Sequence, residues 1–270
     1  MGDGILEYEL EGETLFGGDE VMIEGDDDLT RRTPAEATGY AIVPFLDQSL
    51  QAVIRSGIEQ LIYEAARKHV SVAREDFSLG RYHDLLDDVR HLALVTESGL
   101  RYPNGRFPVD LRLVEERVSD FCGLPVRSKC PSLPAAVGEQ FQVRIIRPQG
   151  KPDHNPPHRD VWLDRLRDGV NVYVPLIGSN ARSSLALVAG SHRWKESEIE
   201  RTVTGATING ISFTVPAVTG WRRAIGMIRP DPREGEMMIF SPYLIHGGGA
   251  NWNEDVTRVS LEMRFWRRTA

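Results

Sequence analysis

The pattern of apolar residues changes near residue 139, and this change constrains the fold of the 270-residue chain more than any other feature. Before it, apolar residues recur every three or four positions, which predicts helices over about 48–69, 81–97 and 109–122. After it, short stretches divided by Gly and Pro predict strands around 141–146, 171–176, 184–188, 235–240, 243–246 and 256–266. Many short strands with such turns indicate a jelly roll, and the helices are expected on one sheet face. We therefore expect a mainly β protein with a helical buttress.

The helical region has a clear start and two expected buried faces. A short strand is expected at 39–44, and Asp47 is a suitable N-cap for the first helix. The faces expected to be buried comprise Leu50, Val53, Ile54, Ile58, Leu61, Ile62 and Ala65, then Leu85, Leu86, Val89, Leu92 and Ala93. We interpret His69, His83 and His91 as structural or surface residues.

Composition narrows the class of protein. The chain is 41% hydrophobic and 26% charged, as expected for a single globular domain spanning 1–270. Its net charge of −7 disfavours nucleic-acid binding, and no apolar run is long enough for a membrane span. The two cysteines, Cys122 and Cys130, are interpreted as reduced thiols in a cytoplasmic protein, although they are close enough in sequence to pair if oxidised. The sequence indicates no particular oligomeric state.

Two segments lie outside the regular pattern. Residues 1–38 form an acidic, Gly-rich extension, in which the alternation at 5–10 and 20–24 is compatible with a hairpin and 26–28 is expected to be a solvated turn. Residues 193–232 form a long segment of helical and extended pieces, which we expect to act as a lid or a substrate wall.

A candidate metal site begins at His158 and Asp160, which follow a Pro-rich loop. If a strand starts at His158, the two side chains share a face and lie about 7 Å apart. His154, in the loop, lacks a carboxylate two positions on and ranks below His158. A distal ligand is available at His246, so that two His and one carboxylate would form the facial triad of non-haem Fe(II) oxygenases.

Arg258 and Ser260 follow His246 on a segment of alternating pattern. The Arg258 guanidinium is suited to grip a carboxylate through two parallel hydrogen bonds, and Ser260 would share its face of the strand. Gln142 and Arg144 share one face of a neighbouring strand, from which they would reach a cosubstrate or substrate. Trp162 would share a face with Asp160, where it would shield the metal, line the pocket or fill the core.

The sequence resembles the phytanoyl-CoA dioxygenase-like branch of the Fe(II)/2-oxoglutarate oxygenases. The matching pieces occur in the family's order between residues 39 and 266. They are Gly39–Pro44, His158–Asp160, Leu185–His192, Gly235–Phe240, Leu244–Gly247 and Arg258.

The resemblance implies a double-stranded β-helix whose triad of His158, Asp160 and His246 binds Fe(II). It implies that 2-oxoglutarate chelates the iron and pairs its distal carboxylate with Arg258, helped by Ser260, and that O2 oxidises a small-molecule substrate with release of succinate and CO2. Tyr173 occupies a position where the family often has an aromatic residue beside the cosubstrate, whereas His192 belongs to a structural Gly-Ser-His turn. Gly248 replaces a hydroxyl residue of some relatives, so one cosubstrate contact is absent.

The expected reaction is a hydroxylation. Halogenating relatives replace the triad carboxylate with Gly or Ala, so Asp160 favours hydroxylation, or a related desaturation, ring closure or epimerisation. We expect natural-product tailoring, and arginines 222, 223, 229 and 233 are candidates for attracting an anionic group. Two alternatives remain open at this point: a cupin-like metal enzyme that does not use 2-oxoglutarate, and a non-catalytic binding module with the same fold.

Overall fold

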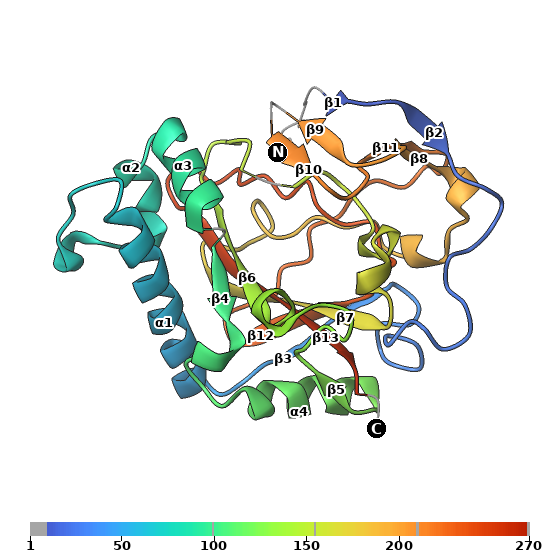
Figure 1. Cartoon of the computed structure of the whole chain (residues 1–270), viewed down its shortest axis with the longest axis horizontal. Coiled ribbons are helices and arrows are strands. Elements are labelled where there is room, and N and C mark those ends of the chain that lie inside the picture. Colours follow the sequence, from blue (N-terminus) through green and yellow to red (C-terminus); the bar gives the residue numbers. More distant parts are fainter. Residues whose placement is uncertain (1–9, 99, 154, 209–210, 269–270) are drawn as a thin grey trace.

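A seven-stranded antiparallel sheet forms the first layer of the molecule, in the order β3–β12–β7–β13–β6–β4, with β5 beside β13 (Figure 1). The structure is a computed structural model that describes residues 10–98, 100–153, 155–208 and 211–268. The strands of this sheet are β3 (Tyr40–Pro44), β4 (Arg101–Pro103), β5 (Val126–Arg127), β6 (Gln140–Ile146), β7 (Gly169–Ile177), β12 (Glu236–Phe240) and β13 (Arg258–Arg267).

A second layer lies over the other face of the sheet and contains the metal-site loops. It begins with β2 (Thr14–Phe16), β8 (Ile199–Thr202) and β11 (Val218–Trp221), which pair in the order β11–β8–β2. The Val218 amide donates to the Pro157 carbonyl at 2.7 Å, and isolated bridges then link His158 to His246, His246 to Leu187, and Leu187 to Ile228. The two layers confirm the mainly β jelly-roll architecture.

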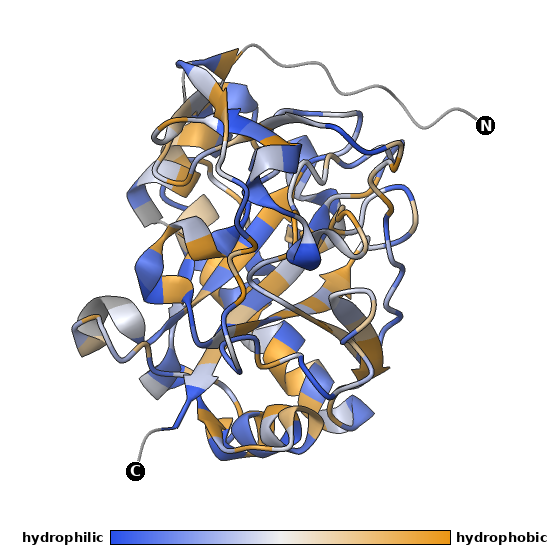
Figure 2. Cartoon of the chain, turned by 90° about the vertical axis from the view of Figure 1, so that its right-hand side faces the viewer, coloured by the Kyte–Doolittle hydropathy of each residue, from blue (hydrophilic) through white to orange (hydrophobic). Residues whose placement is uncertain are grey.

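The helices cover the outer face of the large sheet. They are α1 (Gln48–Ala66), α2 (Tyr82–Leu85), α3 (Asp88–Ser98), α4 (Leu111–Cys122) and the short α5 (Ala135–Gly138), and Figure 1 shows α1, α3 and α4 along its edge and underside. Alternate residues of the central strands pack against the apolar helix faces, and Figure 2 shows hydrophobic and hydrophilic residues alternating along the ribbons. Asp47 caps α1 as expected, its carboxylate accepting from the Leu50 amide at 3.0 Å.

The predicted helix over 81–97 is wrong in continuity and in register. The backbone is extended at Leu86, and Asp87 then starts a new helix by accepting from the Arg90 amide. The register of α3 consequently buries His91 and Leu94, whereas Val89 is 78% exposed and Leu92 is 47% exposed. On the first helix, Val53 is likewise exposed instead of buried.

Other predicted elements are also corrected. The stretches 184–188 and 243–246 form isolated bridges in place of regular strands. β1 (Leu10–Glu11) pairs with β9 (Ala206–Ile208), beside β10 (Ile211–Phe213), and β2 pairs with β8, so both N-terminal strands pair with the 193–232 segment. In the second arm of the expected hairpin, at 20–24, Val21 bridges Lys195 of the same segment. Residues 5–9 of the expected hairpin lie outside the described residues.

The expected solvated turn at 26–28 is wrong for one of its residues. Asp28 is buried, and it accepts hydrogen bonds from Thr30 and from the Ser241 hydroxyl, the latter at 2.8 Å. This contact ties the N-terminal region to the turn that precedes His246. Among the described helices, no segment combines the length and apolarity needed to cross a membrane.

Candidate metal centre

Strand alternation directs one set of side chains away from the helices and toward the second layer. On β13, Val259 and Leu261 pack into the helix-side core, so Arg258 and Ser260 face the opposite way. The same alternation applies to β6 and β7. The polar residues turned to this inner face are Gln142, Arg144, Asn171, Tyr173, Arg258, Ser260, Glu262 and Arg264.

His158 and His246 are held together by a two-way backbone pair. Each amide donates to the carbonyl of the other, at 2.8 and 3.0 Å, and the ring centroids lie 4.4 Å apart. The His158 Nδ1 lies 2.7 Å from the Pro156 carbonyl, and the His246 Nδ1 lies 2.9 Å from the Leu244 carbonyl. Each Nδ1 therefore carries the proton that it donates, which leaves both Nε2 atoms to bind a metal.

Asp160 completes the triad, although not from a strand. It starts a 3-10 helix at Asp160–Trp162. This turn brings the Asp160 side chain closer to His158 than the separation of about 7 Å that a strand would give. The His158 Nε2 lies 3.4 Å from Asp160 Oδ1, and the His246 Nε2 lies 3.9 Å from Asp160 Oδ2. The ligand atoms of all three residues lie within 4.8 Å of one another, which suits an ion about 2 Å from each.

Two side chains that the sequence analysis missed hold the Asp160 carboxylate. The Asn171 amide donates to Oδ2 at 2.9 Å, and the Arg264 guanidinium lies 3.1 Å from the same oxygen. Asn171 lies on the same face of β7 as Tyr173, and Arg264 lies on the same face of β13 as Arg258 and Ser260. Extending the alternation from Arg258 through residue 264 would have found Arg264.

Electrostatics keep Asp160 and His246 in the protonation states that bind metal. Burial alone would raise the pKa of Asp160, but the charge of Arg264 holds it well below its usual range. Burial and the neighbouring His158 lower the pKa of His246 to about 4. An ionised carboxylate and a neutral imidazole are the forms that coordinate a metal ion.

Gly247 allows the chain to turn directly after His246. Its φ is +118°, and a Cβ atom at this position would lie 2.4 Å from the Pro156 carbonyl oxygen. Gly248 also has a positive φ, of 64°, which favours glycine at the position where some relatives carry a hydroxyl. The close approach holds the Pro156 loop, and with it His158, beside His246.

Arg258 and Ser260 lie on the inner face with unsatisfied hydrogen-bonding groups. The Arg258 Nη1 donates to the Ser183 carbonyl at 3.0 Å, while its buried Nε has no hydrogen-bond partner among the described residues. The Ser260 hydroxyl is fully buried and is also without a partner there. Arg258 lines a small cavity together with both histidines and Gly247–Gly249. A buried donor pair of this kind fits a carboxylate that approaches from the metal.

The other three residues expected to contact the cosubstrate are Tyr173, Arg144 and Gln142, and each has a different position relative to Arg258 and the cavities. Tyr173 is buried, with its ring 6.0 Å from the Arg258 guanidinium and its hydroxyl 2.9 Å from Ser179. Arg144 pairs with Glu262 at 3.0 Å and lines the Arg258 cavity. Gln142 lines the larger cavity beyond it.

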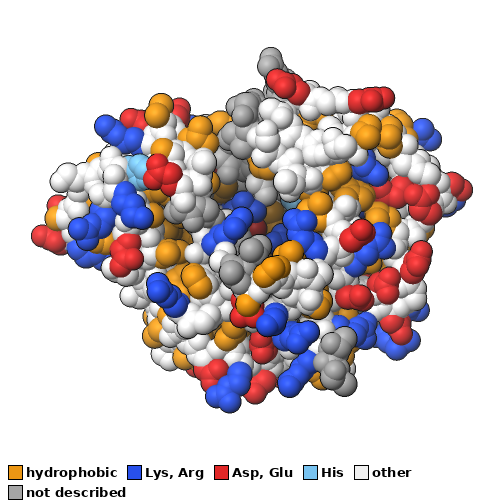
Figure 3. Space-filling view, in the orientation of Figure 1, with side chains coloured by type: hydrophobic (Ala, Val, Ile, Leu, Met, Phe, Trp, Pro, Cys, Tyr) orange, Lys and Arg blue, Asp and Glu red, His pale blue; other side chains and the backbone are white. Residues whose placement is uncertain are grey.

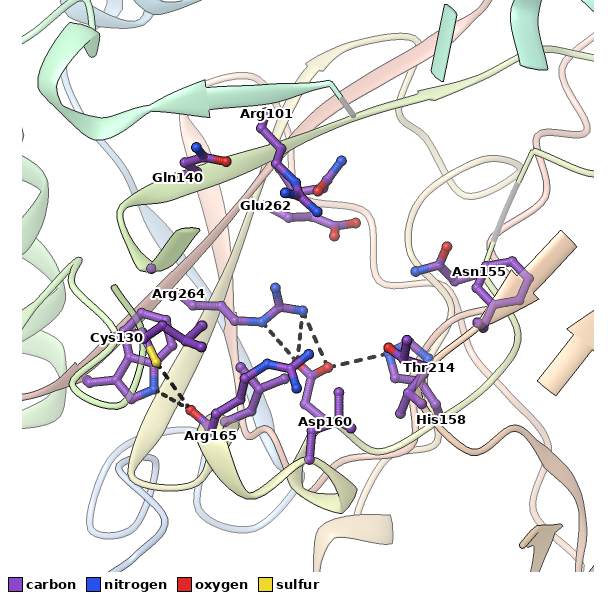
Figure 4. Close-up of a pocket in the computed structure, with 18 of the residues that line it drawn as sticks. Arg101, Cys130, Gln140, Asn155, His158, Asp160, Arg165, Thr214, Glu262 and Arg264 are labelled. Carbon is purple, nitrogen blue, oxygen red and sulfur yellow. Dashed lines mark hydrogen bonds and ion pairs between the residues drawn. The ribbon is translucent and has the colours of Figure 1, made fainter. Parts of the chain in front are cut away.

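A cavity of about 310 Å³ opens beside the triad and is drawn in Figure 4. His158 and Asp160 form part of its wall, and its charged lining includes arginines 101, 144, 165 and 264 together with Glu262. Burial alone would raise the pKa of Glu262, but Arg144 and Arg264 lower it, so this carboxylate is charged. An adjoining cavity of about 350 Å³ shares Gln142, Arg144, Asn155 and Phe213 with the first.

Several residues considered from the sequence lie elsewhere. Trp162 is not part of the cavity wall; its indole donates to Glu196 and Arg201 stacks on it. His192 contacts the Glu36 carbonyl, in agreement with a structural role. His154 lies outside the described residues. Cys122 and Cys130 are both buried and free.

The four arginines of the long segment do not line the cavity beside the triad. Arg223 pairs with Glu198 at 2.7 Å, and Arg222 stacks on Phe16. Arg229 donates to the Ser184 and Ala250 carbonyls, while the Arg233 amide donates to Glu236. The same segment does contribute Phe213, Thr214 and Val215 to the cavity wall.

A second group with possible metal ligands is less suitable. His83, Asp84 and Asp255 also bring ligand atoms within 4.8 Å, but both carboxylates are partly exposed. Arg81 already pairs with the two carboxylates. The triad of His158, Asp160 and His246 is buried and leaves open cavity space beside it, which is the donor set and geometry of non-haem iron centres.

The fold and the site define a jelly-roll protein with a buried two-His, one-carboxylate metal centre. The chain belongs to the phytanoyl-CoA dioxygenase family, whose sequence profile matches residues 36–260. This membership and the donor set support iron and 2-oxoglutarate as cofactor and cosubstrate. No curated protein sequence gives a significant match.

Solved structures with a similar fold share little sequence with this chain. AviO1 from Streptomyces viridochromogenes Tue57 is 16% identical, with 87% of this chain and 92% of that chain covered and a TM-score of 0.50. EctD from S. alaskensis is 14% identical, with 96% and 85% covered and a TM-score of 0.48. At this identity the likeness concerns the fold.

Proposed function

We propose that the protein is an Fe(II)- and 2-oxoglutarate-dependent dioxygenase that hydroxylates a small molecule in natural-product biosynthesis. His158, Asp160 and His246 hold the iron, and Arg258 with Ser260 binds the distal carboxylate of 2-oxoglutarate. The products from the cosubstrate are succinate and CO2. Family membership and the buried triad support this proposal.

The observation that carries the proposal is the pair of unsatisfied donors beside the triad. Arg258 Nε and the Ser260 hydroxyl are both buried without a partner among the described residues. A buried polar group without a partner costs about 1–3 kcal/mol, so a bound carboxylate would recover energy that the empty site loses. Both donors belong to the inner face of β13, and Arg258 lines the small cavity that also contains both histidines.

The chain's own residues prepare the centre for this chemistry. When bound, iron would activate O2, and 2-oxoglutarate would supply two of the four electrons that reduce it, the other two coming from a substrate C–H bond. Asn171 donates to Asp160 Oδ2 and Arg264 donates to both carboxylate oxygens, which fixes the orientation of the carboxylate beside His158. The burial of the triad excludes bulk water, and the carboxylate of Asp160 occupies the position that halogenating relatives leave vacant.

The two alternative functions make different predictions for Arg258. A cupin-like metal enzyme would not need a buried guanidinium with an unsatisfied Nε in the cavity that contains both histidines. A non-catalytic module would not need Asp160 and His246 in metal-binding protonation states. The described contacts therefore favour the dioxygenase.

The test combines binding and turnover. Under anaerobic conditions, Fe(II) and 2-oxoglutarate should together produce the visible charge-transfer absorption of an iron-bound 2-oxo acid. Admission of O2 should then form succinate. Arg258→Ala should weaken 2-oxoglutarate binding about ten- to hundredfold, because a charge-assisted hydrogen-bond pair is lost.

Arg106→Ala is the matched control, since Arg106 is exposed and lies outside the cavities described above. This control should bind 2-oxoglutarate like the unmodified protein. A protein that binds iron but shows neither the absorption nor succinate would contradict the proposal, and so would equal 2-oxoglutarate affinity in Arg258→Ala and Arg106→Ala.

A further inference from the structure

The charges in the cavity beside the triad do not balance. Arg264 is paired with Asp160, and Arg144 is paired with Glu262 at 3.0 Å. Two further arginines of the wall, Arg101 and Arg165, have no acidic partner among the residues that the structure describes. The cavity therefore presents two uncompensated positive charges to whatever enters it.

Arg101 and Arg165 reach the cavity from different elements. Arg101 belongs to β4 at the edge of the large sheet, and Arg165 belongs to the 3-10 turn Asp164–Leu166 that follows the metal-binding loop. In Figure 4 the two side chains extend into the cavity from opposite sides, with Arg264 and Glu262 between them. Both residues are exposed, and Figure 3 shows basic side chains on either side of a hollow near the centre of this face.

We propose that the substrate carries an anionic group, a carboxylate or a phosphate, which Arg101 and Arg165 bind at the mouth of the cavity. The inference rests on the proposed function, because it concerns what the dioxygenase oxidises. Guanidinium groups bind such anions through paired, charge-assisted hydrogen bonds. Charged groups at a cavity mouth also raise the local concentration of oppositely charged molecules.

The charge of the cosubstrate does not remove this imbalance. The metal carries two positive charges and 2-oxoglutarate carries two negative ones, so the pair adds no net charge. The distal carboxylate of 2-oxoglutarate is assigned to Arg258, which lines the small cavity and not the larger one. Arg101 and Arg165 line only the larger cavity, and they remain available to the substrate.

The adjoining cavity suits the uncharged part of the same molecule. Its wall includes Leu92, Val95, Ile145 and Phe213. Its charged groups are satisfied internally, since Arg147 pairs with Asp153 at 2.8 Å and also with Asp88. An acid with an apolar portion therefore matches the two cavities better than a neutral polar molecule does.

The experiment measures anion binding by isothermal titration calorimetry on the full chain. The protein is first saturated with Fe(II) and 2-oxoglutarate without O2, so that the metal and Arg258 are occupied. The probes are benzoate, phenyl phosphate and the neutral benzamide. Either anion should bind more tightly than benzamide, and the tighter of the two identifies the anionic group as a carboxylate or a phosphate.

Arg101→Gln and Arg165→Gln should each weaken anion binding about tenfold, with a larger loss in the double variant. Arg106→Gln is the matched control and should leave the affinity unchanged, because Arg106 is an exposed arginine outside the cavity lining. Equal binding of benzamide and the anions, or unchanged anion affinity in the double variant, would overturn the inference.

Failure of this inference is distinguishable from failure of the proposed function. If the protein with iron and 2-oxoglutarate shows the charge-transfer absorption but its anion binding is independent of Arg101 and Arg165, only the substrate class is wrong. If that absorption never forms, the dioxygenase assignment itself fails. The absorption should persist in Arg101→Gln and Arg165→Gln, which shows that both variants retain the folded centre.

Discussion

At the scale of one residue, the Ser260 hydroxyl is a buried polar group that the fold leaves unsatisfied among the described residues. It lies fully buried on the inner face of β13. A hydroxyl that served only the fold would be expected to have a partner. Ser241 provides the contrast, because its buried hydroxyl donates to Asp28 at 2.8 Å.

We predict opposite effects for these two serines. Ser260→Ala should leave the free energy of unfolding unchanged or raise it by up to about 1 kcal/mol, while weakening 2-oxoglutarate binding about fivefold. Ser241→Ala should lower the free energy of unfolding by about 1–2 kcal/mol, because Asp28 loses a partner, and should leave 2-oxoglutarate binding unchanged. Denaturant unfolding and calorimetric titration measure the two quantities. A Ser260→Ala variant that is destabilised but binds normally would show that the hydroxyl is structural.

Helix α3 shows at the scale of one element how a local start signal sets a register. Asp87 begins the helix four residues before His91, and this register turns His91 inward. The buried imidazole lies 3.0 Å from the Tyr82 hydroxyl and 3.4 Å from Asp153. A neutral His91 satisfies both contacts, since one nitrogen accepts from the hydroxyl and the other donates to the carboxylate.

This arrangement makes the stability of the fold depend on pH. Burial lowers the pKa of His91 to about 4, from an unfolded value of about 6.5. Between these values the unfolded chain binds a proton that the folded protein excludes, so stability falls as the pH drops from about 6.5 to 4. The shift corresponds to at most about 3 kcal/mol.

We predict that His91→Gln removes this dependence. The difference in free energy of unfolding between the unmodified protein and His91→Gln should shrink as the pH falls from 7 to 4, and it should be constant above pH 7. Denaturant titrations at a series of pH values measure it. Parallel pH profiles for the two proteins would mean that His91 is protonated equally in the folded and unfolded states.

The two layers of the whole molecule meet at the metal centre. His158 and His246 are 88 positions apart, and a backbone bridge of the second layer joins them. Asp160 is held by Asn171 and Arg264 of the first layer. A bound ion would therefore connect both layers, and its binding energy would add to the stability of the whole fold.

We predict that metal binding raises the thermal unfolding temperature. At a free Fe(II) or Zn(II) concentration a hundredfold above Kd, the gain is about 2.7 kcal/mol, or several degrees for a chain of this size. His158→Ala and His246→Ala should abolish the shift. His83→Ala should retain it, because His83 belongs to the exposed cluster with Asp84 and Asp255. If the temperature shift were lost in His83→Ala but kept in His246→Ala, the metal would bind at His83, Asp84 and Asp255 and not at the buried triad.

Much of the architecture could be predicted because it depends on local periodicity. The alternation of β6, β7 and β13, the Asp47 cap of α1 and the order of the metal motif are all properties of short stretches. The predictions failed where longer-range contacts decide the conformation. Asp160 lies in a 3-10 turn that Asn171 and Arg264 hold, and the segments near Leu187 and His246 form bridges only because the second layer brings them together.

By itself, the sequence determined which residue types are available: two histidines and a carboxylate in short motifs, and an arginine on an alternating strand. The tertiary structure decided which of them meet, because convergence of residues 158, 160 and 246 requires two layers to pack. It also decided which arginines face the cavity: Arg101 and Arg165 line it, whereas Arg223 pairs with Glu198 elsewhere. Side-chain direction follows from local backbone geometry, but the partner of a charge depends on which distant segments pack beside it.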